Sequence, residues 1–258
     1  MDYIAKIREK QPLIFNITND VATNFSANGL IAIGASPAMS NTPKEAIENA
    51  HGADAVVLNL GTLTEDRAKA MLMAGKAANE KGLPVIIDPI AVGATTFRTD
   101  VIYELLDTVQ VAAICANAGE IAVLGGALEK TESPDSMIEE NEPEIAAAVA
   151  KKYKTVVIAT GKTDVITDGT RTTLCNNGHK MLTNITASGC LLTSLIGAFA
   201  GVTENIYEAS IQATAGYGIA AELAMEKAEG PGTFIPALLD QLYFLDDKTV
   251  VDNLRIKE

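Results

Sequence analysis

The segment Thr186–Gly201, which reads TASGCLLTSLIGAFAG, places a cysteine after three small residues and before a helical apolar pattern. Ala187-Ser188-Gly189 is typical of a turn, so Cys190 is expected in the first turn of a buried helix. Unpaired backbone N–H groups and the positive end of the helix dipole gather there. This setting suits a reactive thiolate and equally suits a bound phosphate. Plain packing is a third interpretation, because cysteine is among the most buried residue types.

Two carboxylates and several small polar residues directly follow predicted strands. Asp88 and Glu120 are hard oxygen ligands suited to Mg²⁺, directly or through water, if both face one cleft. Each also has a local interpretation, Asp88 as a turn cap and Glu120 as the start of a helix. Thr160 offers a hydroxyl for a nucleotide phosphate, and Met39 offers a soft apolar wall for a ring.

Short apolar runs predict the strands that must position these residues. Their Val/Ile-rich, non-alternating character indicates strands covered on both faces, hence a mainly parallel sheet in an α/β fold. The predicted strands are Leu13–Ile17, Ala55–Leu60, Pro84–Asp88, Val111–Cys115 and Thr155–Ala159, and Leu30–Gly34 is a further strand-like run before a turn at Ser36–Met39. Ligands bind beyond the carboxyl ends of parallel strands, so the polar residues should converge on that edge.

Longer patterns predict the helices, and a change of pattern predicts an edge to the sheet. The helical stretches are Thr64–Glu80, Glu144–Lys152, Ser188–Ala200, Ile206–Lys227 and Ile235–Leu245. Asp164–Thr167, Arg171–Leu174 and His179–Leu182, separated by Asp-Gly and Asn-Gly pairs, predict an antiparallel meander. The acidic stretch Glu129–Glu144 predicts a solvated loop. Without a repeat or a linker, residues 1–258 are expected to form a single domain.

Two segments resemble nucleotide-binding motifs, but their neighbouring residues and predicted secondary structure do not match those motifs. Thr160-Gly-Lys-Thr163 lacks the first glycine of a phosphate-binding loop and precedes a predicted strand, where that motif requires a helix. Gly216-Tyr-Gly-Ile-Ala-Ala221 fits a dinucleotide pattern but lies inside a predicted helix, which favours small-residue packing.

Composition excludes several classes of protein. The net charge of −13 argues against nucleic acid and against an anionic membrane surface as partners. A phosphate ligand must therefore be met by local donors and a divalent cation. Three cysteines without a paired spacing indicate a reducing compartment, and no secretory signal pattern is visible, so a cytoplasmic protein is expected. With only two histidines, a histidine-rich metal site is excluded.

The chain resembles the hydroxyethylthiazole kinases over nearly its whole length. The blocks that carry the resemblance are N16-ITNDVATNFSANGLIAIGASPA-M39, N59-LGT-L63, V85-IID-P89, G93-ATTF-R98, N117-AGE-I121, A159-TGKTDV-I166, N177-GH-K180, T186-ASGCLL-T193 and G230-PGT-F234. This resemblance implies a ribokinase-like three-layer sandwich with an antiparallel meander at one edge of the sheet. It also implies phosphorylation of the hydroxyl of 4-methyl-5-(2-hydroxyethyl)thiazole with ATP and Mg²⁺ in thiamine biosynthesis, by a homotrimer with active sites at its subunit interfaces.

The resemblance also implies roles for single residues. Substrate contacts fall on Met39, Asn19, Gly61 and Ala187, ATP contacts on Thr160, Asn117 and Cys115, and magnesium contacts on Asp88 and Glu120. Gly189 and Cys190 are the predicted catalytic residues, with the amides of residues 187–190 stabilising developing charge. Cys190 stands where the wider superfamily usually has an aspartate that activates the acceptor hydroxyl.

Two departures from the family pattern bear on rate more than on fold. Cys115 replaces a basic residue that contacts ATP, which should weaken triphosphate binding. Ala187 replaces a glycine, and alanine is expected to require a negative φ at this position. A catalytically weak thiazole-binding module, another ribokinase-like kinase of the hydroxymethylpyrimidine type, and a cysteine hydrolase with a histidine partner remain as alternatives.

Overall fold

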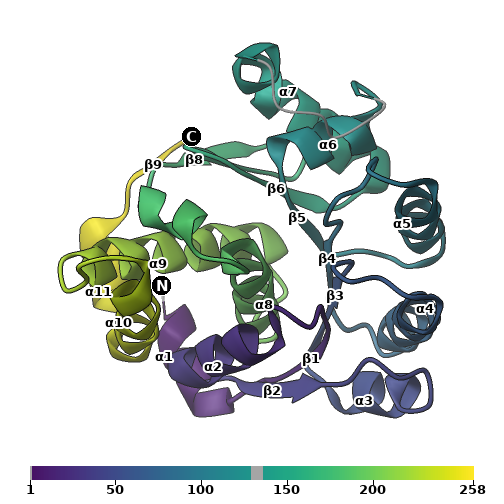
Figure 1. Ribbon diagram of the computed structural model, residues 1–258, viewed down its shortest axis with the longest axis horizontal. Helices are drawn as coiled ribbons and strands as arrows, with labels where there is room; N and C mark the ends of the chain where they lie inside the picture. Colours follow the sequence, from purple (N-terminus) through teal and green to yellow (C-terminus); the bar gives the residue numbers. More distant parts are fainter. Residues whose placement is uncertain (1, 129–135) are drawn as a thin grey trace.

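Within the described residues, a nine-stranded sheet in the order β2-β1-β3-β4-β5-β6-β7-β8-β9 forms the centre of the molecule (Figure 1). The computed structural model describes the backbone of residues 2–128 and 136–258, and the side chains of those residues apart from 136–141. Strands β2 to β6 pair in parallel, and β7 to β9 continue the sheet in antiparallel fashion. The strands are β1 Leu13–Ile17, β2 Ser36–Met39, β3 Ala55–Asn59, β4 Val85–Asp88, β5 Ala113–Asn117, β6 Val156–Thr160, β7 Asp164–Thr167, β8 Thr172–Cys175 and β9 Ile256–Lys257.

Helices cover both faces of this sheet, which makes a three-layer sandwich (Figure 1). The helices are α1 Tyr3–Lys10, α2 Thr23–Ile33, α3 Ala46–Gly52, α4 Glu65–Glu80, α5 Thr96–Thr108, α6 Ala118–Gly125, α7 Ser136–Tyr153, α8 Ser188–Ala200, α9 Ile206–Met225, α10 Pro231–Phe244 and α11 Asp247–Asn253, with a 3₁₀ helix at Lys180–Asn184. None of those described is long and apolar enough to cross a membrane.

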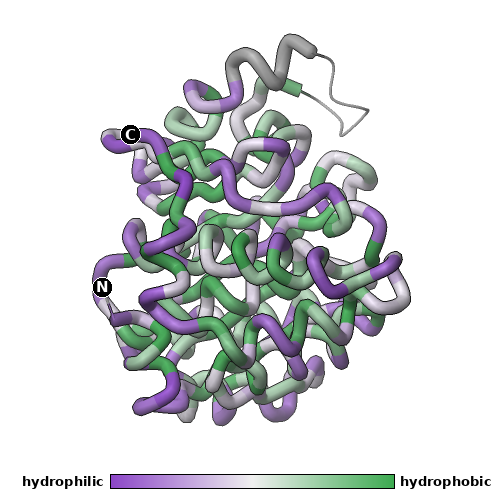
Figure 2. The backbone as a smooth tube through the Cα atoms, turned by 90° about the vertical axis from the view of Figure 1, so that its left-hand side faces the viewer, coloured by the Kyte–Doolittle hydropathy of each residue, from purple (hydrophilic) through white to green (hydrophobic). Residues whose placement is uncertain are grey.

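Successive strand residues enter opposite hydrophobic cores, because side chains alternate across a strand. Ile14 and Val57 pack with α1, α2, α8, α9 and α10, whereas Phe15 and Val56 pack with α3 to α7. Both faces are therefore buried, which explains why the strands read as continuous apolar runs. In Figure 2 the hydrophobic stretches lie mostly in the middle of the molecule.

The two strand predictions that failed concern short segments beside turns. Leu30–Gly34 is not a strand: it ends α2, and Gly34 adopts the left-handed conformation (φ 104°) that terminates a helix. The strand is instead β2, in the segment expected to be a turn. His179–Leu182 is likewise not a strand: His179 caps the 3₁₀ helix, and the other three residues lie within it. The last strand is β9, recruited from the far end of the sequence, and local patterning cannot reveal such a pairing.

The acidic stretch Glu129–Glu144 is only partly within the described residues. Residues 129–135 lie outside them, and from Ser136 onward the chain is in α7, so the loop prediction is wrong for that part. The C-terminal half of α7 supplies the reason, because Ala146, Val149 and Ala150 are buried in the core on that side of the sheet.

Both apparent nucleotide motifs have the contexts predicted for them. Thr160 ends β6 and residues 161–163 connect it to β7, so a strand follows the motif and not a helix. Gly216 and Gly218 lie inside α9. A Cβ atom at Gly218 would come within 2.6 Å of the backbone of Asn177, so only glycine allows this approach.

Besides packing against Gly218, the segment 176–178 binds residues near the C-terminus of the chain. Arg255 N donates to Asn177 Oδ1 (2.8 Å) and Asn177 Nδ2 donates to Asn253 O (3.0 Å). Glu222 of α9 accepts from Gly178 N at 2.6 Å and forms an ion pair with Arg255. Helix α9 and the segment that connects α11 to β9 therefore fix residues 176–178 jointly.

Two glycines of α9 provide a matched test of this packing. We expect Gly218→Ala to destabilise the fold by about 1–3 kcal/mol, because the new methyl group meets backbone atoms that cannot move aside. Gly216→Ala should be neutral or stabilise by up to about 1 kcal/mol, because its Cβ would lie 3.4 Å from a flexible Leu245 methyl group. Denaturant unfolding of both variants measures the difference, and equal free energies of unfolding would contradict the packing described.

Candidate active site

A cavity of about 590 Å³ lies at the carboxyl ends of β5 and β6, beside the start of α8. Its lining residues come from the strand ends, the segment before the 3₁₀ helix, and helices α8 and α9: Asn117, Thr160, Gly161, Lys162, Asp164, Asn177, Gly178, His179, Lys180, Leu182, Thr183, Ser188, Gly189, Leu192, Thr214, Tyr217 and Gly218. Three predicted site residues, Asn117, Thr160 and Gly189, thus share one cavity. Asn117 and Thr160 are directly paired in the β5–β6 register.

The first turn of α8 presents backbone amides to this cavity. The first intrahelical bond runs from Leu191 N to Ala187 O (3.0 Å), so the amides of residues 188–190 precede the regular ladder. A Cβ atom at Gly189 would meet nothing within 4 Å, which leaves the space above this turn open. Helix α8 therefore begins with an anion cradle of the kind that binds phosphate.

Ala187 has a backbone conformation opposite to the one expected. Its φ is +64° and its ψ is 14°, so the prediction of a negative φ is wrong. The chain must reverse here to enter α8, and the left-handed conformation makes that turn at a cost of about 1–2 kcal/mol for a non-glycine residue. The alanine thus keeps the glycine-like geometry at the start of the helix.

Asn19, Gly61 and Cys190 form a second group next to the first turn of α8. Asn19 Nδ2 donates to Cys190 Sγ at 3.3 Å. A Cβ atom at Gly61 would lie 2.7 Å from the Asn19 side chain, so the close approach requires glycine. Three predicted site residues, distant in sequence, thus lie together.

The Cys190 thiol is not poised for ionisation. Burial, followed by the nearby charge of Asp88, raises the pKa of Cys190 to about 11. The thiol is therefore neutral near pH 7, and the start of the helix does not offset its desolvation. Of the three interpretations of this segment, the reactive thiolate is the one the geometry disfavours.

Asp88 ends β4 as a buried carboxylate in contact with α8. Its Oδ2 accepts from Asn59 Nδ2 (2.7 Å) and from Thr193 Oγ1 (3.2 Å). Burial and then the charge of Glu120 raise the pKa of Asp88 well above its usual range. Asp88 and Glu120 therefore repel each other across this edge of the sheet, and a cation between them would relieve that repulsion.

Glu120 has the local role that the sequence left open. It forms a capping box with Asn117: Glu120 Oε2 accepts from Asn117 N (3.0 Å), and Asn117 Oδ1 accepts from Glu120 N (2.9 Å). Oε1 accepts from Ala91 N at 2.8 Å, which ties the loop after β4 to α6. Burial raises the pKa of Glu120 although both backbone donors oppose the shift.

These two carboxylates fit a hydrated magnesium ion better than a protein cage. Among the described residues, no group of three or more His, Cys, Asp or Glu side chains is placed to hold a metal. Mg²⁺ usually keeps several waters and binds one or two carboxylates together with substrate phosphates. Asp88 contacts α8 through Thr193, and Glu120 lies in the first turn of α6; neither lines the cavity, but two carboxylates of this kind match that donor set.

Cys115 and Met39 lie outside the cavity. Cys115 is 2% exposed in β5, within the core beneath α8, and burial raises its pKa well above its usual value. A buried neutral thiol supplies no charge to a triphosphate, so the structure does not bring Cys115 to a nucleotide. Met39 is half-buried at the end of β2, opposite Asn16 in the β1–β2 register, and its substrate contact stays a prediction.

Several polar residues of the site were missed by the sequence analysis. Asn59 and Thr193 lie within the quoted blocks, yet only the folded chain shows that both contact Asp88. Lys162 and Lys180 bring positive charge to the cavity of an acidic protein. Asp164, the first residue of β7, also lines the cavity, and burial raises its pKa to about 6. The sequence analysis placed Asp164 only at the start of a predicted edge strand, and nothing in that pattern indicated that its carboxylate would line a cavity.

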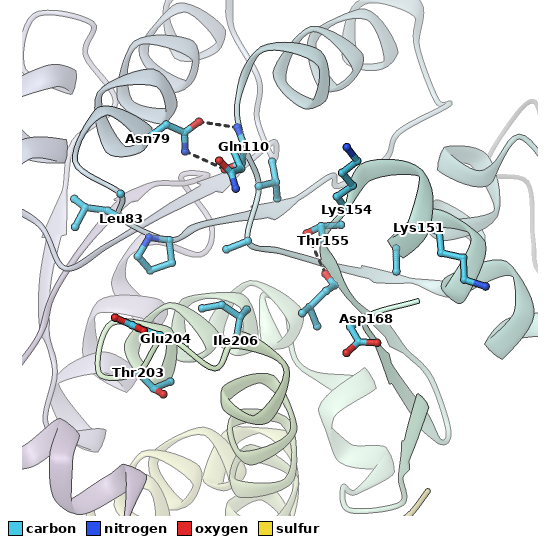
Figure 3. A pocket seen from close by; sticks show the side chains of 16 residues that line it. Asn79, Leu83, Gln110, Lys151, Lys154, Thr155, Asp168, Thr203, Glu204 and Ile206 are labelled. Carbon is cyan, nitrogen blue, oxygen red and sulfur yellow. Dashed lines mark hydrogen bonds between the residues drawn. The ribbon is translucent and has the colours of Figure 1, made fainter. Parts of the chain in front are cut away.

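A larger cavity, of about 800 Å³, lies at the amino ends of β4, β5 and β6 (Figure 3). Its polar residues are engaged locally: Asn79 exchanges two hydrogen bonds with the backbone of Gln110, at 3.0 and 2.6 Å. The amino groups of Lys151 and Lys154 point away from it (Figure 3). No predicted site residue lines this cavity.

The architecture is shared with solved kinases. The chain superposes on the pyridoxal kinase from Staphylococcus aureus in complex with AMP-PCP and pyridoxal with a TM-score of 0.59, at 14% identity, over 81% of this chain and 87% of that one. Identity this low indicates the fold alone. Together with the mainly parallel sheet, this similarity shows the ribokinase-like α/β fold that was predicted.

Closer comparisons define the family. The model of the hydroxyethylthiazole kinase family matches residues 4–248. Hydroxyethylthiazole kinase 2 of Oceanobacillus iheyensis is 68% identical over 258 residues, covering 100% of this chain and 99% of that protein. The structure of a hydroxyethylthiazole kinase protein from Pyrococcus horikoshii OT3 has a TM-score of 0.91 at 38% identity, over 99% of this chain and 96% of that one. The chain therefore belongs to the hydroxyethylthiazole kinase family, and it is a kinase.

Asp164 provides a test of the electrostatics of the cavity. Its folded-state pKa of about 6 exceeds the ordinary value of 3.8, so the folded state binds the proton more tightly. This group's contribution to stability is therefore lost as pH rises from about 4 to about 6. Asp164→Asn keeps an acceptor for Gly161 N and removes the charge.

We expect Asp164→Asn to exceed the wild-type free energy of unfolding by roughly 1–3 kcal/mol at pH 8, and to match it near pH 3. Denaturant unfolding at a series of pH values measures the difference between the two proteins. A difference that does not change between pH 3 and pH 8 would show that Asp164 ionises normally.

Proposed function

We propose that the protein phosphorylates the hydroxyl of 4-methyl-5-(2-hydroxyethyl)thiazole with ATP, in thiamine biosynthesis, and that the two substrates meet at the start of α8. The observation that carries this proposal is the placement of two adjacent residues. Gly189 lines the cavity that contains Thr160 and Asn117, whereas Cys190 contacts Asn19 beside Gly61. The first turn of α8 thus lies between a nucleotide side, which Gly189 faces, and an acceptor side, which Cys190 faces.

On the nucleotide side, the donors suit a triphosphate. The amides of residues 188–190 would stabilise the charge that develops on the transferred group, since fixed donors need no reorganisation during reaction. Lys162 and Lys180 would offset the negative charge of ATP. Asp88 and Glu120 would hold Mg²⁺, which neutralises phosphate charge when bound.

On the acceptor side, Cys190 acts by position. A thiol with a pKa of about 11 is a poor base near pH 7, and phosphoryl transfer through a loose transition state needs little base assistance. The neutral thiol, fixed by Asn19, would instead orient the alcohol toward the phosphoryl group.

The cysteine hydrolase has no histidine partner among the described contacts. His51 lies at the end of α3, where its Nε2 is 3.7 Å from Glu80 Oε2. His179 lines the nucleotide side, and its Nδ1 accepts from Met181 N at 3.1 Å. Nucleophilic thiol chemistry needs a base beside the sulfur, so this alternative is disfavoured.

The working assembly is proposed from the resemblance. We infer a homotrimer of single-domain chains in the cytoplasm, with each active site completed at a subunit interface. All three cysteines are free thiols, which is consistent with a reducing compartment.

The direct test combines the purified protein with ATP, Mg²⁺ and hydroxyethylthiazole and follows phosphorylated thiazole by mass spectrometry. Product should require all three components, and Asp88→Asn should lower kcat by roughly 100-fold or more, because it removes a charge from the metal site. Thiazole binding without any ATP-dependent product would select the binding module instead. Phosphorylation of hydroxymethylpyrimidine in preference to the thiazole would select the other kinase.

Cys190→Ser separates positioning from thiol chemistry. We expect turnover to fall by roughly 10- to 100-fold without vanishing, the scale of a lost positioning contact. The wild-type rate should also show no thiol ionisation between pH 6 and pH 9, because the pKa of Cys190 lies near 11. Complete loss of activity in a folded Cys190→Ser protein would instead support a nucleophilic thiol.

A further inference from the structure

Asn59 occupies the position where the two sides of the proposed site meet. It is the last residue of β3 and is 1% exposed. Its Nδ2 donates to Asp88 Oδ2 at 2.7 Å, and its Oδ1 accepts from Asn19 Nδ2 at 2.9 Å. Asn19 Nδ2 also donates to Cys190 Sγ at 3.3 Å. A continuous series of buried hydrogen bonds therefore joins the carboxylate of Asp88 to the thiol of Cys190.

Backbone amides fix the direction of this series. Asn59 Oδ1 also accepts from Gly61 N at 3.1 Å, and Asn19 Oδ1 accepts from Ala22 N at 2.8 Å. If either side-chain amide were flipped, its NH₂ group would face a backbone N–H donor, and two donors cannot pair. Asn59 must therefore present its donor to Asp88, and Asn19 must present its donor to Asn59 and Cys190.

We propose that Asn59 is a positioning residue, which fixes Asp88 on the nucleotide side relative to Cys190 on the acceptor side. This inference rests on the proposed function, since it concerns how the two substrates are aligned. Asn59 itself touches neither substrate: it acts through Asp88 and through Asn19. Alignment of reacting groups is costly to lose, because a misplacement of about 1 Å lowers rate by up to about 100-fold.

Two substitutions dissect this arrangement. Asn59→Asp keeps an oxygen that accepts from Asn19 and Gly61, but turns a second oxygen toward Asp88, so only the nucleotide side is disturbed. Asn59→Ala removes the contacts to both sides. Asn16→Ala is the matched control, because Asn16 is also buried near the end of a strand and accepts from Ser194 Oγ of α8 at 2.9 Å. Ser194 Oγ in turn contacts only the backbone carbonyl of Cys190 (3.1 Å), so within the described residues Asn16 has no hydrogen bond to Asp88, Asn19 or the Cys190 thiol.

The first readout is steady-state kinetics in the phosphorylation assay. Asn59→Ala should lower kcat about 100-fold while the KM values for ATP and thiazole stay within about 3-fold. Asn59→Asp should lower kcat and raise the KM for ATP, because two carboxylates then face each other at the metal site. Asn16→Ala should lose stability and keep its kcat. A kcat for Asn59→Ala within about 3-fold of that for Asn16→Ala would overturn the proposal.

The second readout needs no activity and uses the three cysteines as reporters. Iodoacetamide labelling without substrates, resolved by peptide mass spectrometry, gives a separate rate for Cys115, Cys175 and Cys190. Asn59→Ala should raise the rate several-fold at Cys190 alone, and Asn59→Asp should leave that rate unchanged. A common rise at all three cysteines would show general loosening and contradict positioning. If the wild-type protein forms no product, the proposed function fails, and the labelling pattern still decides whether Asn59 fixes Cys190.

Discussion

The site depends on one constraint: polar groups buried at the carboxyl edge of a parallel sheet must satisfy each other. Asn59, Asp88 and Thr193 do so with side-chain hydrogen bonds that cross from β3 to β4 and to α8. Breaking one such contact would leave a buried group unpaired, at a cost of about 1–3 kcal/mol. The positions of the chemically active groups are therefore tied to the stability of the sheet edge, and a rigid framework presents them to the open cavity.

Electrostatics at this edge is unfavourable without ligands. Asp88, Glu120 and Asp164 all have raised pKa values, chiefly because burial disfavours their charged forms. Perturbed carboxylates of this kind are typical of functional sites. In a protein with a net charge of −13, the cation and phosphate of the proposed reaction would offset this electrostatic cost.

The sequence predicted elements most accurately where the local residue pattern and the packing in the fold favour the same structure. Strand β1 and helix α8 have the predicted bounds, because apolar runs buried on both faces and a small-residue turn are local features. The α/β class and the convergence of Asn117, Thr160 and Gly189 followed from the parallel arrangement. The strand at Ile256–Lys257 could not be foreseen, because it depends on a partner at Thr172–Cys175 that only the fold brings near. The left-handed φ of Ala187 was missed because residue type favours the opposite sign.

The segment at residues 176–178 links the cavity to the chain segment just before β9. Asn177 and Gly178 line the cavity, and the backbone N–H of Arg255, 78 residues beyond Asn177 in the chain, donates to the Asn177 side chain. During synthesis on the ribosome, this wall therefore emerges well before the residues that hold it in place. A nascent chain whose Arg255 has not yet emerged lacks those contacts, so this wall of the cavity is held in place only after the C-terminal segment has joined it.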